Sequence, residues 1–105
     1  MAKISKEVID KLHKFIDFVE KQDIHIDSAI LFGSYAKGSN NKLSDIDLAL
    51  VSEMFEGNRY KDLDKLADAC IKIDTDISPL PYRPEDFVED DLFVKEILKT
   101  GIRII

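Results

Sequence analysis

The sequence predicts an α/β fold in which a small mixed sheet is flanked by helices. Some segments carry apolar residues at helical spacing, and others carry the short apolar or alternating runs of strands. In chain order these are a helix at 6–22, a strand at 26–32, a short helix that starts at the Gly-Ser turn, a strand at 45–51, a helix at 60–70, a strand at 71–77 and a helix at 91–100. Helices that alternate with strands pack against a sheet. With 105 residues, we expect one domain, spanning 1–105.

The composition excludes several classes of protein. The chain has a formal net charge of −6 and no cluster of Lys or Arg, which argues against direct binding of nucleic acid because such binding needs a basic face. No segment is long and apolar enough to span a bilayer, and the charged N-terminus is unlike a signal peptide, so we expect a cytoplasmic protein without a membrane partner. The single Cys70 cannot form an intramolecular disulfide and is expected in the core.

The first helix has a clear signature. Its apolar stripe consists of Val8, Ile9, Leu12, Phe15, Ile16 and Val19. Ser5 is the expected N-cap. His13 lies off this stripe, and His25 has no Cys or His neighbour at the spacing of metal ligands, so we expect neither histidine to be catalytic.

Two aspartates open the second predicted strand and share one of its faces. Asp45 and Asp47 are two residues apart, and side chains alternate along a strand, so both carboxylates point the same way while Ile46, Leu48 and Leu50 point toward the core. Neighbouring carboxylates repel each other, which favours a cation between them, and Mg²⁺ prefers such oxygen ligands. Asp47 also lies within an apolar strand, where a charge needs a partner. The pair therefore predicts a Mg²⁺ site.

A Gly-Ser turn precedes these aspartates. Gly33 and Ser34 end the first apolar strand, and residues 35–44 separate them from Asp45. Glycine lets the backbone approach a ligand closely, and a Ser hydroxyl with neighbouring N–H groups can hold phosphate oxygens. A small-residue turn for phosphate beside carboxylates for a metal indicates nucleotide chemistry.

A third carboxylate can come from the third predicted strand, 71–77. Asp74 and Asp76 alternate with isoleucines there and so are expected to share a face, which leaves either of them as the candidate. Beyond them, the three prolines of 79–84 predict a stiff extended connection, and Arg83 within it is expected to form a surface ion pair.

The C-terminal part is expected to hold one helix and a short closing strand or tail. Acidic residues begin the helix at 91–100 and Lys99 lies near its end, which suits the helix dipole. Its expected buried residues are Phe93, Val94, Ile97 and Leu98. Gly101 is the expected stop, and residues 102–105 are apolar enough for a short strand.

The motifs resemble the nucleotidyltransferase superfamily of the DNA polymerase β type, and most closely the minimal nucleotidyltransferases often encoded beside HEPN-domain proteins. Members carry Gly-Ser, a short spacer and Asp-x-Asp, as in Gly33-Ser34 and Asp45-Ile46-Asp47, and then a third acidic residue on a later strand. The resemblance implies a polymerase-β-like fold and favours Asp76 over Asp74 as that third residue. The chain departs from the pattern at Lys37, where many members have the planar fork of Arg.

The resemblance also implies an activity and a set of ligands. Asp45, Asp47 and Asp76 would hold two Mg²⁺ ions, while Gly33 and Ser34 would bind the β- and γ-phosphates of ATP. The reaction would transfer AMP from ATP to an acceptor hydroxyl and release pyrophosphate, driven by positioning and by charge stabilisation.

The acceptor is expected on a partner protein. Residues 78–105 are too few for a separate acceptor-binding domain. In the minimal branch that this chain resembles, the partner is a HEPN-domain toxin neutralised by AMP transfer to a Tyr hydroxyl, which would make this chain the antitoxin. Two alternatives stay open at this stage: an antitoxin that inhibits by direct binding with a weak or inactive site, and a small-molecule nucleotidyltransferase. The base preference, the acceptor atom, the number of nucleotides added and the oligomeric state are open too.

Overall fold

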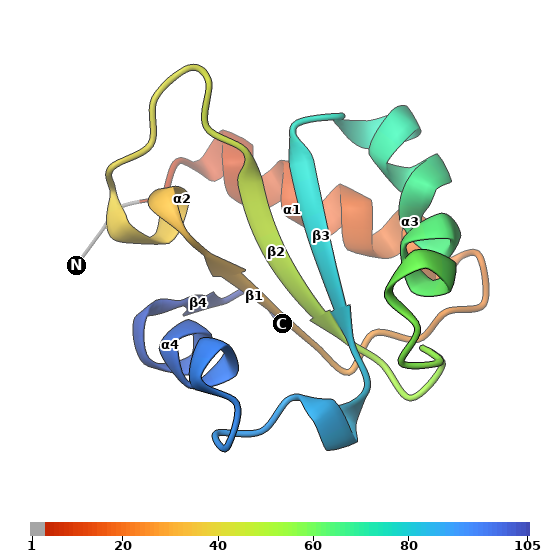
Figure 1. The fold of residues 1–105 in the computed structure, drawn as a ribbon. Helices are drawn as coiled ribbons and strands as arrows, with labels where there is room; N and C mark the ends of the chain where they lie inside the picture. The colour runs from red at the N-terminus through yellow and green to blue at the C-terminus, as the bar shows by residue number, and fades with distance from the viewer. Residues whose placement is uncertain (1–3) are drawn as a thin grey trace.

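Four strands form one mixed sheet in the order β3-β2-β1-β4 in a computed structural model, which describes residues 4–105 (Figure 1). Strand β1 pairs antiparallel with β2 and β4, whereas β2 pairs parallel with β3. The elements in chain order are α1 (Lys6–Glu20), β1 (Ser28–Phe32), α2 (Ser34–Lys37), β2 (Ile46–Val51), α3 (Arg59–Ile73), β3 (Ile77–Tyr82), the 3₁₀ turn η1 (Pro84–Asp86), α4 (Leu92–Thr100) and β4 (Ile102–Arg103). The predicted fold class and the mixed sheet are confirmed.

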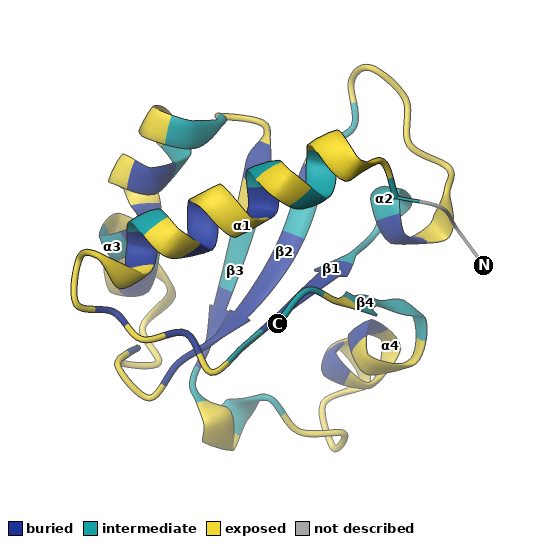
Figure 2. Ribbon diagram, turned by 180° about the vertical axis from the view of Figure 1, so that it is seen from behind, coloured by how far each residue is buried: buried dark blue, intermediate teal, exposed yellow. Residues whose placement is uncertain are grey.

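Different helices cover the two faces of the sheet, as Figures 1 and 2 show. On one face, α1 and α3 bury their apolar stripes against Leu48 and Leu50 of β2. On the other face, Val94 and Ile97 of α4 pack against Ala49 of β2. Because successive side chains of β2 alternate between these two clusters, Asp47 lies on the face that α4 partly covers.

The prediction of a third strand at 71–77 is wrong. Helix α3 continues to Ile73, and β3 begins only at Ile77. The isoleucines of 71–77 suit a strand by their alternation, but Ile73 also continues a helical stripe that includes Leu66 and Ala69, while Ile71 is exposed to solvent. Because this stripe packs on the sheet, α3 extends to Ile73.

The proline-rich segment is itself the third strand rather than a connection. Pro79 and Pro81 lie within β3 and pair in register with Leu48 and Leu50 of β2. A proline cannot donate to a neighbouring strand, and it is tolerated here because β3 is an edge strand with only one partner. The structure therefore corrects the boundary but keeps the expected extended backbone.

Most local expectations at the ends of elements are met. The Ser5 hydroxyl accepts a hydrogen bond from the Val8 N–H and caps α1, as predicted. The thiol of Cys70 is half-buried and packs against the core. The prediction fails for Phe93 and Leu98, which are 53% and 42% exposed, because only Val94 and Ile97 of α4 point into the sheet. No helix within residues 4–105 is long and apolar enough to cross a membrane.

Candidate active site

The two aspartates of the sequence motif lie at the start of β2. Asp45 is exposed and directly precedes the strand, and Asp47 is its second residue. The register sets Asp47 beside Phe32 of β1 on one side and Ser78 of β3 on the other. Asp47 therefore lies on an interior strand, near the edge of the sheet at which β1 leads into the Gly-Ser turn.

The environment of Asp47 disfavours its charge. Partial burial raises the pKa of the Asp47 carboxyl, and the nearby negative charge of Asp45 raises this pKa further. A cation bound between the two residues would relieve both effects. Their oxygen atoms are the donors that Mg²⁺ prefers, so this pair fits the predicted metal.

Gly33 lies directly against Asp47. Its backbone has φ 72° and ψ −150°, a conformation that only glycine adopts readily. A Cβ atom at this position would overlap Asp47 Oδ2 and lie 3.2 Å from its Cγ. The turn then enters α2 at Ser34, and the Lys37 N–H donates to the Gly33 carbonyl at 3.1 Å. The structure thus brings Gly33 against Asp47, with Ser34 following as the first residue of α2.

The two candidates for the third carboxylate have different surroundings. Asp74 ends α3 and accepts from Lys11 Nζ at 2.6 Å and from the Asp76 N–H at 2.7 Å. The hydrogen bond from Lys11 and that from the Asp76 N–H hold the pKa of Asp74 below its usual value. Asp74 is therefore bound to α1, on the opposite face of the sheet from Asp47.

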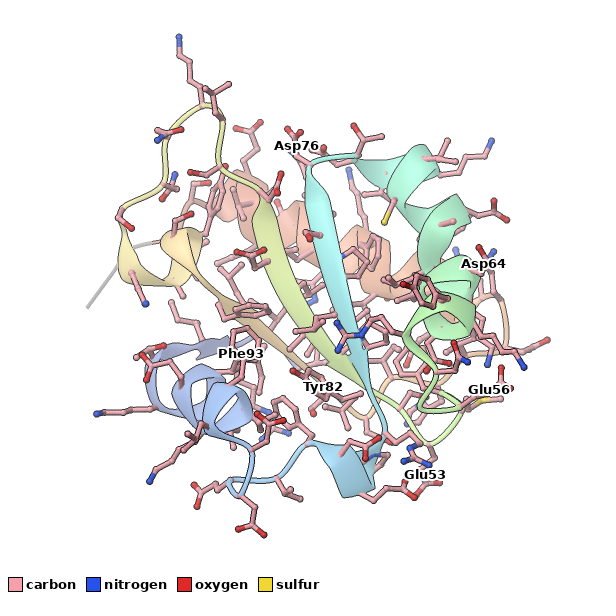
Figure 3. All side chains as sticks on the ribbon, in the orientation of Figure 1. Glu53, Glu56, Asp64, Asp76, Tyr82 and Phe93 are labelled. Atoms are coloured by element: carbon pink, nitrogen blue, oxygen red, sulfur yellow. The ribbon has the colours of Figure 1, made fainter. Side chains whose placement is uncertain are left out.

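Asp76 lies next to the start of β2. Its carbonyl accepts a hydrogen bond from the Ile46 N–H at 2.8 Å, so its backbone adjoins Asp45. Ser78, two residues further along the chain, pairs with Asp47 in the register of β2 and β3. Asp76 itself is exposed and lies in the turn directly before β3 (Figure 3). The expectation that Asp74 and Asp76 share a face is wrong, because Asp74 belongs to the end of a helix.

Within residues 4–105, no three Asp, Glu, His or Cys side chains converge closely enough to form a preformed metal site. The exposed His25 is paired with Glu20 and Asp27, at 3.3 and 3.4 Å. Arg83 binds Asp86 at 2.7 Å, which is the surface ion pair that the sequence predicts. His25 and Arg83 therefore have acidic partners of their own.

A cavity of about 350 Å³ opens beside Asp47. Its lining comes from three parts of the chain: Phe32, Gly33, Lys37, Asp47, Phe93, Glu96, Ile97 and Thr100. The sequence prediction missed Phe93, which it assigned to the core. The missed signal is the helical period, because Phe93, Glu96 and Thr100 lie at i, i+3 and i+7 and form a stripe next to that of Val94 and Ile97.

The mixed sheet, the paired aspartates and the glycine turn against them define a class of α/β protein that handles nucleotides. The chain belongs to the nucleotidyltransferase domain family, which matches residues 10–105. It is accordingly a nucleotidyltransferase, and the predicted family is confirmed.

Comparison with individual proteins agrees with this family. A protein of Methanocaldococcus jannaschii named "Putative protein adenylyltransferase MJ0141" is 33% identical over 100 residues, which are 93% of this chain and 96% of that protein. Among solved structures, a toxin–antitoxin with AMP-PNP matches with a TM-score of 0.59 and 22% identity, covering 92% of this chain and 72% of that one. A mutant of the toxin–antitoxin MntA-HpeT matches with a TM-score of 0.58 and 19% identity, with the same coverage. These structures share the fold.

Proposed function

We propose that this protein is a Mg²⁺-dependent adenylyltransferase that transfers AMP from ATP to a Tyr hydroxyl of a HEPN-domain toxin and thereby acts as its antitoxin. The relative with 33% identity is named for protein adenylyl transfer, and it spans nearly the same length as this chain. The structures of the same fold are toxin–antitoxins, one of them with an ATP analogue. Together these likenesses favour a protein acceptor over a small molecule.

The contact between Gly33 and the Asp47 carboxylate supports the proposal most strongly. A phosphate chain needs a backbone that it can approach without meeting a side chain, and the metal that accompanies it needs carboxylate oxygens within reach. Gly33 offers the first and Asp47 with Asp45 the second, side by side. A purely structural turn has no need of a half-buried carboxylate with a raised pKa beside it.

Each side chain then has a role in the proposed transfer. Asp45, Asp47 and Asp76 would hold Mg²⁺, which when bound would neutralise phosphate charge and favour loss of a proton from a hydroxyl. The Ser34 hydroxyl and the backbone of Gly33 hold the β- and γ-phosphates. Asp76, exposed in the turn before β3, would complete the metal site on the side of the acceptor. The acceptor Tyr hydroxyl gives its proton to solvent water as its oxygen bonds to the α-phosphorus. The bond from that phosphorus to the bridging oxygen of the β-phosphate breaks, and pyrophosphate leaves with that electron pair.

The charge of the chain suits a cationic protein partner. A net charge of −6 attracts a basic surface, such as that of a toxin that cuts RNA, and speeds the encounter of the two proteins. The same charge disfavours direct binding of nucleic acid by this chain. The partner therefore brings the acceptor and the docking contacts, while this chain brings ATP and the metal ligands.

The decisive experiment is intact-mass analysis of the partner. The purified toxin is incubated with this protein, Mg²⁺ and ATP, and in parallel with the Asp45→Asn variant. We expect the toxin mass to rise in steps of one AMP with the native chain only, and peptide mapping to locate the addition on Tyr. A toxin whose mass does not change under these conditions would contradict the proposed transfer.

One observation favours a second candidate, an antitoxin that inhibits by contact alone. No three carboxylate, His or Cys side chains of residues 4–105 form a preformed metal cluster, as a site without catalytic function would also show. If this candidate is correct, the toxin in the same experiment is bound and inhibited but its mass does not change. The Asp45→Asn variant then inhibits the toxin as well as the native chain does.

A further inference from the structure

We infer that the cavity between α4 and the Asp47 end of the sheet binds the base and ribose of the nucleotide, with Phe93 as the surface on which the base stacks. This inference rests on the proposed function, since it completes the site for the same substrate. It assigns a role to α4, which the motif residues leave without one.

The position of the cavity carries the first step. Its lining includes Gly33 and Asp47, the residues proposed for phosphate and metal, so a group bound in the cavity lies next to that site. The remaining wall is mostly apolar and comes from Phe32, Phe93 and Ile97. At about 350 Å³ it is within the size range of small-ligand pockets, which combine apolar walls with a few polar groups. The cavity can therefore accommodate a nucleoside attached to bound phosphates.

Phe93 supplies a stacking surface. Its ring meets the Phe32 ring edge-on, with centroids 5.8 Å apart and planes at 90°, and it remains 53% exposed although its neighbour Val94 is fully buried. Figure 3 shows Phe93 on α4, between that helix and the sheet. The contact with Phe32 holds the ring in one orientation, and its exposed part is free for a flat partner. Stacking suits any base, because every base has a π-face.

The charges around the cavity set the direction of the nucleotide. Lys37 lies on the α2 side, next to Gly33, whereas Glu96 lies on the α4 side, one helical turn from Phe93. Glu96 would repel a phosphate but can accept hydrogen bonds from ribose hydroxyls or from an amino group of a base. The phosphates therefore belong near Gly33 and Lys37, and the nucleoside belongs near Glu96 and Phe93.

Fluorescence offers a direct test because the chain contains no Trp. The Phe93→Trp variant carries a single reporter at the proposed stacking position, and Leu92→Trp carries one at the adjacent residue, which is 81% exposed and lies outside the cavity lining. We expect MgATP to quench Phe93→Trp and magnesium tripolyphosphate to leave it unchanged. Leu92→Trp should respond to neither ligand.

Calorimetric titration of unlabelled variants gives the second measurement. Phe93→Ala should weaken MgATP binding about tenfold, as loss of a base stack does, and should leave the binding of magnesium tripolyphosphate unchanged. Phe93→Tyr keeps the ring and should restore the native affinity, and Leu92→Ala should match the native chain. Thermal melts of each variant confirm that it is folded.

Other results would overturn the inference. If Phe93→Ala lost affinity for MgATP and for tripolyphosphate equally, or lost no affinity for MgATP, the base would not bind in this cavity. Neither result would contradict the proposed transfer. A native chain that binds neither ligand would overturn the inference and the proposed function together. Slower AMP transfer by Phe93→Ala at unchanged ATP affinity would assign the cavity to the acceptor side chain instead.

Discussion

Gly33 lies so close to the carboxylate of Asp47 that no side chain fits between them. A Cβ on Gly33 would overlap Asp47 Oδ2, and the positive φ of 72° disfavours any other residue independently. The contact follows from the sheet, because Phe32 pairs with Asp47 in the register of β1 and β2 and Gly33 is the next residue. The glycine and the second aspartate of the motif are thus one structural unit.

The substitution Gly33→Ala should damage both the fold and the reaction. The strained backbone and the overlap with Asp47 should lower the free energy of unfolding by about 1–3 kcal/mol. Displacement of the Asp47 carboxylate should slow AMP transfer on the order of a hundredfold, because metal ligands tolerate little misplacement. Denaturant titration and a transfer assay measure the two effects separately.

Gly57→Ala is the matched control for that variant. Gly57 has a φ of 82°, and its Cβ would meet the Arg83 guanidinium, with Nε at 2.6 Å, so it suffers the same kind of strain far from Asp47 along the sheet. It should lose stability and keep transfer. Native transfer rates in Gly33→Ala would show that the contact with Asp47 has no part in the chemistry.

Asp47→Asn should abolish transfer and stabilise the fold at neutral pH. The pKa of Asp47 is raised on folding, so its charged form costs stability, and this cost appears as the pH rises from the unfolded toward the folded pKa. The variant lacks the charge and should be more stable by roughly 0.2–1 kcal/mol, the size of exposed charge interactions. The difference in stability between the variant and the native chain should vanish below the ordinary Asp pKa of about 3.9. Thermal melts at a series of pH values measure it.

Asp76→Asn should abolish transfer, whereas Asp74→Asn should keep it. The backbone carbonyl of Asp76 accepts from the Ile46 N–H at the start of β2, while Asp74 is engaged by Lys11 of α1. If Asp74→Asn lost AMP transfer and Asp76→Asn kept it in the same assay, the third carboxylate would be Asp74 instead.

Asp74→Asn should instead lower stability. The pKa of Asp74 is depressed on folding, so its charge stabilises the protein above the unfolded pKa, and this contribution is lost as the pH falls through the folded pKa. Removal of the ion pair with Lys11 should cost roughly 0.2–1 kcal/mol at pH 7 and nothing in strong acid. Lys11→Met should show the same loss at pH 7, and an unchanged melting temperature in both variants would contradict this account.

Mg²⁺ and ATP together should stabilise the protein more than either alone. The metal relieves the repulsion between Asp45 and Asp47, and the phosphates complete its coordination. A ligand at a hundred times its dissociation constant adds about 2.7 kcal/mol to the free energy of unfolding. Thermal melts with both, either and neither ligand test this, with Asp47→Asn as the control that should not respond. No shift with both ligands at saturating concentration would argue against an intact site.

The order of elements and the motif were predictable from the sequence because both are recorded in short segments. The alternation of Ile46, Leu48 and Leu50 with Asp47 sets one face of β2, and the spacing of Gly33-Ser34 from Asp45 indicates the family. The structure and the family match bear out these two predictions. The assignment of individual residues to metal and phosphate stays a prediction that the variants above test.

Tertiary packing decided what the sequence left ambiguous. The isoleucines of residues 71–77 suit a strand, whereas Ile73 also suits the stripe of α3. The packing of Ile73 against the core keeps it in the helix, and β3 starts only at Ile77. That boundary sets Asp74 at the end of α3, where Lys11 binds it, and sets Asp76 in the turn next to the start of β2. The exposure of Phe93 was likewise undetermined, because the face that a short helix buries depends on how it docks onto the sheet. Local patterns fix which side chains share a face of an element, and only the assembled sheet fixes what that face meets.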